Sequence, residues 1–139
     1  MTSVAGHVYN RDFPKEFQNR KSDPLRLFDA PTIRNLDKHS RTVAKHLQMV
    51  SRGVDFIVLW LDCDKEGENI CFEVLDICRK SIPQSKRQRV YRAKFSSIAK
   101  KDLQTAFDNL SNQPNYNESV SVDARQVMDL KIGVAFSRY

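Results

Sequence analysis

The fold is decided by the stretch Phe56-Ile57-Val58-Leu59-Trp60-Leu61-Asp62-Cys63-Asp64-Lys65-Glu66-Gly67-Glu68. Its first six residues are apolar and are large or β-branched, which is the pattern of a buried strand. Four carboxylates then fall within seven residues, at the end of that strand. In an open α/β sheet, ligands bind at the carboxyl ends of the strands. The stretch therefore predicts an α/β protein with an acidic site at that edge of its sheet.

Negative charges this close together repel one another, so they require a counter-charge or bound protons. Mg²⁺ is the usual counter-charge for hard oxygen ligands, and it takes one or two carboxylates while keeping several waters. A competing explanation is an acidic first turn of a helix, because Asp and Glu suit the positive end of the helix dipole. That explanation covers Glu66 and Glu68 but not Asp62 and Asp64 on the strand side. We therefore expect a Mg²⁺ site that handles phosphates.

The positive charge of the chain is concentrated in one segment. The formal net charge is +6, and residues 79–101 contain nine basic side chains and no acid: Arg79, Lys80, Lys86, Arg87, Arg89, Arg92, Lys94, Lys100 and Lys101. A basic segment beside an acidic metal loop is typical of an enzyme that acts on nucleic acid, since the cations hold the phosphate backbone. A lysine-rich solvated surface remains the alternative.

The length, the apolar stretches and the cysteine count limit which class of protein this can be. At 139 residues the chain is long enough for one domain with a core. No apolar stretch approaches the ~20 residues that a membrane span needs, so we expect no membrane partner. The three cysteines form no C-x-x-C pair, and an odd count argues against a disulfide framework. Cys71 and Cys78 lie seven residues apart on a predicted helix, so both are expected in the core.

The order of the predicted elements indicates a parallel α/β sheet, because strands and helices alternate. We predict a short strand over residues 3–9, a surface excursion over 10–38 with one helical turn near 24–28, a helix over 39–51, a strand over 55–61, a helix over 66–80, a strand over 89–95, a helix over 97–109 and a last helix over 122–136. On the last helix, one apolar stripe is predicted from Ala124, Met128, Ile132 and Ala135.

Four motifs in this order resemble the Toprim domain of type IA DNA topoisomerases. They are Ser3-Val4-Ala5-Gly6-His7, the D-x-D-x-E-G-E run of residues 62–68, Arg92-Ala93-Lys94-Phe95-Ser96-Ser97-Ile98, and Ser121-Val122-Asp123-Ala124-Arg125-Gln126-Val127-Met128-Asp129-Leu130-Lys131-Ile132-Gly133. The sequence of residues 59–74 resembles that of the eukaryotic topoisomerase III branch. It resembles the beta form of that branch more than the alpha form. The resemblance implies a Toprim-type, mostly parallel sheet flanked by helices.

The resemblance also implies a reaction and a set of site residues. These enzymes cut one DNA strand through a tyrosine that becomes linked to the 5′ phosphate, pass the other strand and reseal the break. Asp62, Asp64 and Glu66 match the acidic triad that holds Mg²⁺, whereas Glu68 is expected to orient the loop or cap the helix. The residues expected to contact DNA are Arg92, Arg125, Lys65 and His7. We also expect Arg125 to pair with Asp129, four residues further along the same helix.

The resemblance covers only part of the machinery of such an enzyme. No tyrosine of this chain lies in the nucleophile motif of the family, and the glutamate of the first Toprim strand has no counterpart. We therefore expect a fragment: residues 1–118 as a Toprim domain lacking its first strand, and residues 119–139 as a C-terminal helix that starts the next, DNA-binding domain. Such a fragment is expected to bind Mg²⁺ and single strands weakly without relaxing DNA.

For the full-length enzyme, the resemblance implies single-stranded DNA as the substrate, with RNA as an open alternative. It also implies a RecQ-type helicase or scaffold protein as partner, and a nuclear location, with the cytoplasm as the alternative for a beta-like form. Two other functions stay open. One is another Toprim enzyme, such as a nuclease or primase, which would lack the helix motif of residues 121–133. The other is a non-catalytic nucleic-acid-binding module that retains the acidic loop.

Overall fold

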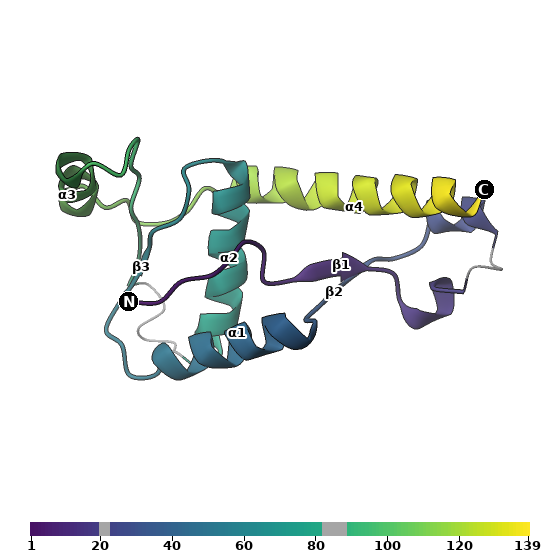
Figure 1. The fold of residues 1–139 in the computed structure, drawn as a ribbon, viewed down its shortest axis with the longest axis horizontal. Coiled ribbons are helices and arrows are strands. Elements are labelled where there is room, and N and C mark those ends of the chain that lie inside the picture. Colours follow the sequence, from purple (N-terminus) through teal and green to yellow (C-terminus); the bar gives the residue numbers. More distant parts are fainter. Residues whose placement is uncertain (20–22, 82–88) are drawn as a thin grey trace.

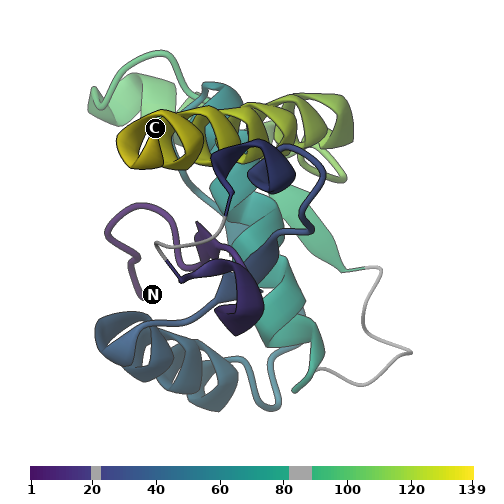
Figure 2. The same ribbon diagram turned by 90° about the vertical axis from the view of Figure 1, so that its right-hand side faces the viewer.

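The computed structural model describes residues 1–19, 23–81 and 89–139. Its central element is the helix α2 (Lys65–Arg79), which lies between two other helices. The helix α4 (Tyr116–Arg138) crosses one end of α2, and α1 (Lys38–Val50) packs at the other end (Figures 1 and 2). None of the helices in the described ranges combines the length and the apolarity that crossing a membrane requires.

A parallel βαβ unit forms the heart of the fold. Strand β3 (Ile57–Leu59) pairs in parallel with β4 (Val90–Arg92), with Leu59 opposite Arg92, and α2 lies on the connection between them. This confirms the predicted α/β fold with a parallel sheet, although each strand is shorter than predicted. Among the residues that the structure describes, β3 pairs with β4 alone. The expectation that this chain lacks the first strand of a Toprim domain stays a prediction.

The acidic stretch passes directly into α2, as the sequence predicts. Asp64 is the N-cap, and its Oδ1 accepts a hydrogen bond from the backbone N–H of Gly67 at 2.7 Å. The apolar face of α2 then packs against β3, β4 and α1. This first core consists of Val8, Ala44, Leu47, Leu59, Cys71, Val74, Leu75, Ile77, Cys78 and Val90. The predicted burial of Cys71 and Cys78 is therefore confirmed.

Residues 10–38 do not form the predicted surface excursion. Strands β1 (Asn10–Asp12) and β2 (Ile33–Asn35) pair antiparallel, and the 3-10 turns η1 (Lys15–Phe17) and η2 (Pro24–Leu27) lie between them. Phe13 and Leu27 are buried in a second core with Ala30 and with Ala135 of α4. Only the predicted helical turn near residues 24–28 is confirmed. The prediction failed because the buried residues follow neither period of a regular element.

The segment over residues 3–9 contains no strand, although one was predicted there. Instead the backbone bends at Gly6, whose φ of 85° lies in the left-handed region that glycine adopts readily. Val8 and the nearby His7 then pack beside α2 rather than in a sheet.

Helix α4 starts earlier than predicted, because the side chain of Asn115 accepts hydrogen bonds from the N–H groups of Asn117 and Glu118. The predicted apolar stripe is wrong in part: Met128 and Ile132 are exposed, whereas Val122 and Ala135 are buried. The predicted domain division after residue 118 lies inside this helix and stays a prediction. The remaining helix, α3 (Lys100–Asp108), lies between β4 and α4 in the chain.

Gly67 is the position where the turn from the acidic loop into α2 depends on the absence of a side chain. A Cβ atom there would lie 2.0 Å from the carbonyl oxygen of Asp62, a backbone atom that cannot move away independently. We expect Gly67→Ala to lower the free energy of unfolding by about 1–3 kcal/mol. The matched control is Gly133→Ala in α4, where a Cβ meets nothing and alanine should stabilise the helix by about 0.5–1 kcal/mol. Urea unfolding followed by circular dichroism measures both, and equal effects would contradict the close approach.

Candidate active site

The acidic loop presents its first two carboxylates to solvent. Asp62 and Asp64 are both exposed, at the carboxyl end of β3 and the start of α2. One oxygen of Asp64 caps the helix, which leaves its second oxygen and the whole carboxylate of Asp62 directed outward. Lys65, the first residue of α2, is also exposed. These side chains can therefore meet a ligand without any rearrangement of the core.

Arg92 lies in a predicted strand, but its side chain is buried. The guanidinium is completely buried, and its Nε donates to Oε1 of Glu68 at 3.0 Å. Its remaining N–H groups donate to the backbone carbonyls of Leu61 at 2.9 Å, Asp62 at 2.8 Å and Ala93 at 2.7 Å. An arginine with 0% exposure and these partners does not reach a DNA backbone in this structure. In this structure Arg92 holds the backbone of the acidic loop, and the DNA contact expected of it stays a prediction.

Glu68 completes this buried pair and links it to α4. Its second oxygen, Oε2, accepts from the backbone N–H of Asn115, the N-cap residue of α4, at 2.5 Å. Glu68 therefore connects β4, through Arg92, with the start of α4. The sequence analysis expected Glu68 to orient the loop or to cap the helix. In the structure it binds the arginine that donates to the loop carbonyls.

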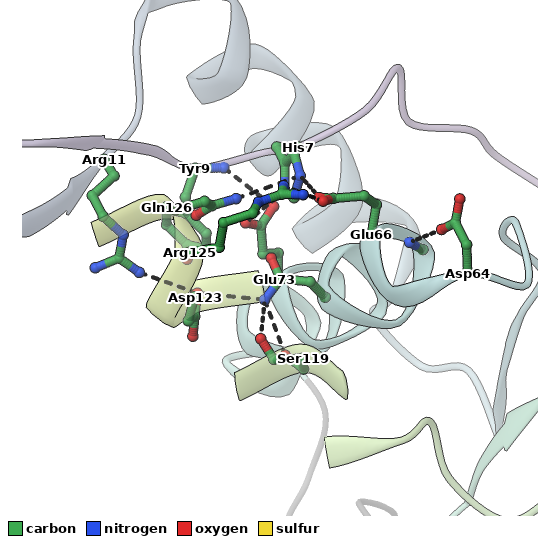
Figure 3. Close-up of polar contacts among 12 residues, drawn as sticks. His7, Tyr9, Arg11, Asp64, Glu66, Glu73, Ser119, Asp123, Arg125 and Gln126 are labelled. Carbon is green, nitrogen blue, oxygen red and sulfur yellow. Dashed lines mark hydrogen bonds and ion pairs between the residues drawn. The ribbon is translucent and has the colours of Figure 1, made fainter. Parts of the chain in front are cut away.

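His7 lies between two carboxylates of α2 (Figure 3). Its Nε2 lies 2.8 Å from Oε2 of Glu66, and its Nδ1 lies 3.1 Å from Oε1 of Glu73. The hydrogen bond with Glu73 is the main cause that raises the pKa of His7 to about 9, against partial burial, and Glu66 adds to the rise. The imidazolium is therefore the expected form at neutral pH, and a cation lies beside the acidic loop.

Arg125 of α4 supplies a second cation to the same place. It forms an ion pair with Glu66, and its Nε lies 3.9 Å from Oδ2 of Asp129, the partner expected from the sequence. The side chain of Arg125 is 59% exposed, so it remains accessible from solvent. The amide of Gln126 approaches Nε2 of His7 at 3.5 Å. The structure therefore brings together Glu66, His7 and Arg125 from three separate parts of the chain.

The chemistry of the donor set fits Mg²⁺, but the placement is incomplete. Asp62 and Asp64 offer exposed carboxylate oxygens, which are the ligands that Mg²⁺ prefers. Glu66 reaches toward His7 and away from Asp64 (Figure 3). Among the described residues, no three acidic, histidine or cysteine side chains converge on a point that could hold a metal ion. The structure thus offers two exposed carboxylates, Asp62 and Asp64, and a third, Glu66, that is paired with cations.

Sequence reasoning missed Glu73. This carboxylate is buried, and besides His7 it accepts from the backbone N–H of Val8 at 2.7 Å. Its position contained a usable signal, since Glu66 and Glu73 lie seven residues apart and therefore share one face of α2. An acid on the same helical face as a predicted site residue was a candidate partner for it.

The Arg92–Glu68 pair is expected to be strongly coupled. Arg92→Met leaves a buried carboxylate without its cation, which should lower the free energy of unfolding by about 3–5 kcal/mol. Adding Glu68→Gln removes the orphaned charge and should recover part of that loss. Urea unfolding of the two single variants and the double variant measures the coupling. Losses that simply add would show that the pair is not acting as a unit.

The raised pKa of His7 predicts a pH dependence of stability. The folded state holds a proton up to about pH 9, whereas an unfolded histidine loses it near 6.5. The stabilisation is therefore complete below about pH 6.5 and is lost as the pH rises through 9. The urea midpoint of the wild type should fall across this window, and His7→Gln should remove that fall. The control is His39→Gln, which replaces an exposed histidine of α1 and should retain the fall.

Comparison with known proteins supports the motifs and the fold together. The sequence profile of the Toprim domain matches residues 1–98. DNA topoisomerase 3-beta of Arabidopsis thaliana is 51% identical over 140 residues, covering 100% of this chain and 16% of the relative. Human DNA topoisomerase 3-beta-1 is 48% identical with the same coverage, and human DNA topoisomerase 3-alpha is 39% identical with 14% of its length covered.

The sequence identity is higher to the beta relatives than to the alpha relative, as the sequence of residues 59–74 predicts. The chain spans about a sixth of the length of these proteins, 16% for the beta forms. The parallel βαβ unit, the acidic loop at its carboxyl end and these identities lead to one conclusion. The chain belongs to the type IA DNA topoisomerases of the topoisomerase III group, of which it represents the Toprim region.

Proposed function

We propose that this chain supplies the acidic, phosphate-handling site of a topoisomerase that cuts, passes and reseals single DNA strands through a phosphotyrosine intermediate. The observation that carries the proposal is the pair of exposed carboxylates, Asp62 and Asp64, at the carboxyl end of β3. Two cations, His7 and Arg125, lie beside the next acid of the same loop. Acids for a metal and cations for a phosphate therefore occupy one edge of the fold.

Asp62 and Asp64 are the residues that would hold Mg²⁺, with Glu66 as the third ligand expected from the family. When bound, the ion supplies charge compensation for a phosphate and orients its oxygens. The backbone that carries these ligands is held in place, because Arg92 binds the carbonyls of Leu61 and Asp62. The side chains of the two aspartates therefore project from a fixed base.

Arg125 and His7 are proposed to bind the backbone of the strand. A guanidinium presents a planar fork of donors that suits a phosphate, and Arg125 is well exposed. An imidazolium adds a second donor at the same edge, and Lys65 extends the positive charge beside the acidic loop. Arg92 is omitted from this surface because it is buried.

Tyr9 is close to the site but is unsuited to be the nucleophile. Its hydroxyl donates to Asp76 at 2.9 Å, and burial, followed by that hydrogen bond, raises its pKa to about 12. An attacking tyrosine needs the opposite shift, because the phenolate is the reactive form. We propose that the nucleophile comes from another part of the longer enzyme. The helicase or scaffold partner, the nuclear location and the use of RNA are further proposals from the family.

The metal proposal is tested by titrating the chain with Mg²⁺ in a calorimeter. Asp62→Asn and Asp64→Asn should each weaken binding at least tenfold, because each removes one anionic ligand from a site that uses two. The control is Asp108→Asn, which removes the same charge from exposed α3 and should leave the affinity unchanged. Equal affinity of Asp62→Asn and the wild type would refute the site. It would favour the alternative of a nucleic-acid-binding module that needs no metal.

A further inference from the structure

Glu66 lies between two cations, although its place in the acidic run predicts a metal ligand. Its Oε2 lies 2.8 Å from Nε2 of His7, and its Oε1 accepts from Arg125. The side chain is directed away from Asp64 (Figure 3). Both carboxylate oxygens are therefore engaged. Among the described residues, Glu66 forms no group with Asp62 and Asp64 that could hold a metal ion in this arrangement.

The His7 side of this arrangement is anchored by Glu73. The carboxylate of Glu73 is 3% exposed and accepts from Nδ1 of His7 and from the backbone N–H of Val8. A buried acid bonded to one ring nitrogen fixes the orientation of the imidazole and directs the other nitrogen outward. Here the outward nitrogen, Nε2, is the one that faces Glu66.

The cations that hold Glu66 are the same ones that are suited to a phosphate. Arg125 is 59% exposed and His7 is 29% exposed in their side chains, so an approaching strand can reach both. A phosphate group accepts charge-assisted hydrogen bonds from these donors as a carboxylate does. A strand that binds there must therefore compete with Glu66 for Arg125 and His7.

We propose that Glu66 becomes a metal ligand only when a strand is bound, and that Glu73 is a positioning residue for this arrangement. Without a strand, Arg125 and the His7 that Glu73 orients retain Glu66. A strand phosphate that takes over the two cations releases Glu66, which then joins Asp62 and Asp64 at Mg²⁺. The inference rests on the proposed function and adds a coupling between strand binding and Mg²⁺ binding. By linkage, strand and metal strengthen the binding of each other by the same factor, typically about 5–150-fold.

The test is calorimetric titration of the purified chain with Mg²⁺, in the presence and absence of a saturating short oligothymidylate. The oligonucleotide should tighten Mg²⁺ binding to the wild type within the range given above. Arg125→Gln should bind Mg²⁺ more tightly than the wild type without any oligonucleotide, because only His7 then still holds Glu66. The oligonucleotide should then add little. An unchanged affinity of Arg125→Gln without the oligonucleotide would overturn the proposal.

A double-variant comparison separates release of Glu66 from a general charge effect. Removing any cation near the site favours Mg²⁺ by electrostatics alone, so Arg125→Gln is also measured together with Glu66→Gln. If the gain depends on Glu66, the second substitution abolishes it. A gain that persists in the double variant overturns the proposal. Lys45→Gln removes the same charge from an exposed position of α1, the helix that packs at the end of α2 away from α4, and should show no gain.

The role of Glu73 has its own readout. Glu73→Gln retains volume and an acceptor for the N–H of Val8, but it replaces the carboxylate that holds His7. The ¹⁵N chemical shifts of the His7 ring report the protonation and hydrogen bonding of each ring nitrogen, and they should change in Glu73→Gln but not in Lys45→Gln. Glu73→Gln should also bind Mg²⁺ more tightly without oligonucleotide. Unchanged ring shifts would overturn the positioning role.

The failure of this inference can be distinguished from failure of the proposed function. If Asp62→Asn binds Mg²⁺ as the wild type does, the metal site itself is refuted. If Asp62→Asn loses Mg²⁺ binding while Arg125→Gln has the Mg²⁺ affinity of the wild type, the metal site stands. Only the strand-dependent role of Glu66 is then overturned. Arg125 is exposed, so its substitution leaves the cores intact and keeps the test valid even if Glu73→Gln does not fold.

Discussion

The buried ion pair between Arg92 and Glu68 is the interaction on which the acidic site depends. Two charges removed from water are costly unless their remaining donors and acceptors are also bonded. Here the guanidinium donates to four backbone carbonyls in addition to Glu68, those of Leu59, Leu61, Asp62 and Ala93. The second oxygen of Glu68 accepts from the backbone N–H of Asn115. The pair therefore joins β3, β4, α2 and the start of α4, and it fixes the backbone from which the aspartates project.

The chain thus separates the fixed part of the site from the exchangeable part. The carbonyls of Leu61 and Asp62 are bound by a buried arginine, and the close approach at Gly67 fixes the entry into α2. The carboxylates of Asp62, Asp64 and Glu66 face the other way, toward solvent or toward partly exposed cations. A rigid backbone with exchangeable side-chain partners is suited to a site whose ligands arrive and leave.

The site also extends beyond the part of the chain that the Toprim profile matches. That match ends at residue 98, yet Arg125 comes from α4 and pairs with Glu66 of the acidic loop. Helix α4 is in turn bound to α2 through Asn69, whose amide donates to the carbonyl of Ser119 at 3.0 Å. Packing between α2 and α4 therefore decides which cations lie beside the acids. The second core around Phe13, Leu27 and Ala135 holds the far half of α4 against the N-terminal segment.

The sequence by itself determined the βαβ unit and the position of the acidic loop. The apolar run before Asp62, the capping aspartate and the apolar face of α2 are local patterns, and each acts over one strand or a few helical turns. The family also followed from the sequence, because its motifs are contiguous.

Only the tertiary structure decided what the charged residues do. A sequence pattern cannot distinguish an arginine that binds DNA from one that is buried against Glu68, since both lie in a basic segment. The engagement of Glu66 by His7 and Arg125 joins residues that are 59 positions apart on either side. The core around Phe13 likewise joins residues from the two ends of the chain. Such contacts arise from packing between elements, and no local period records them.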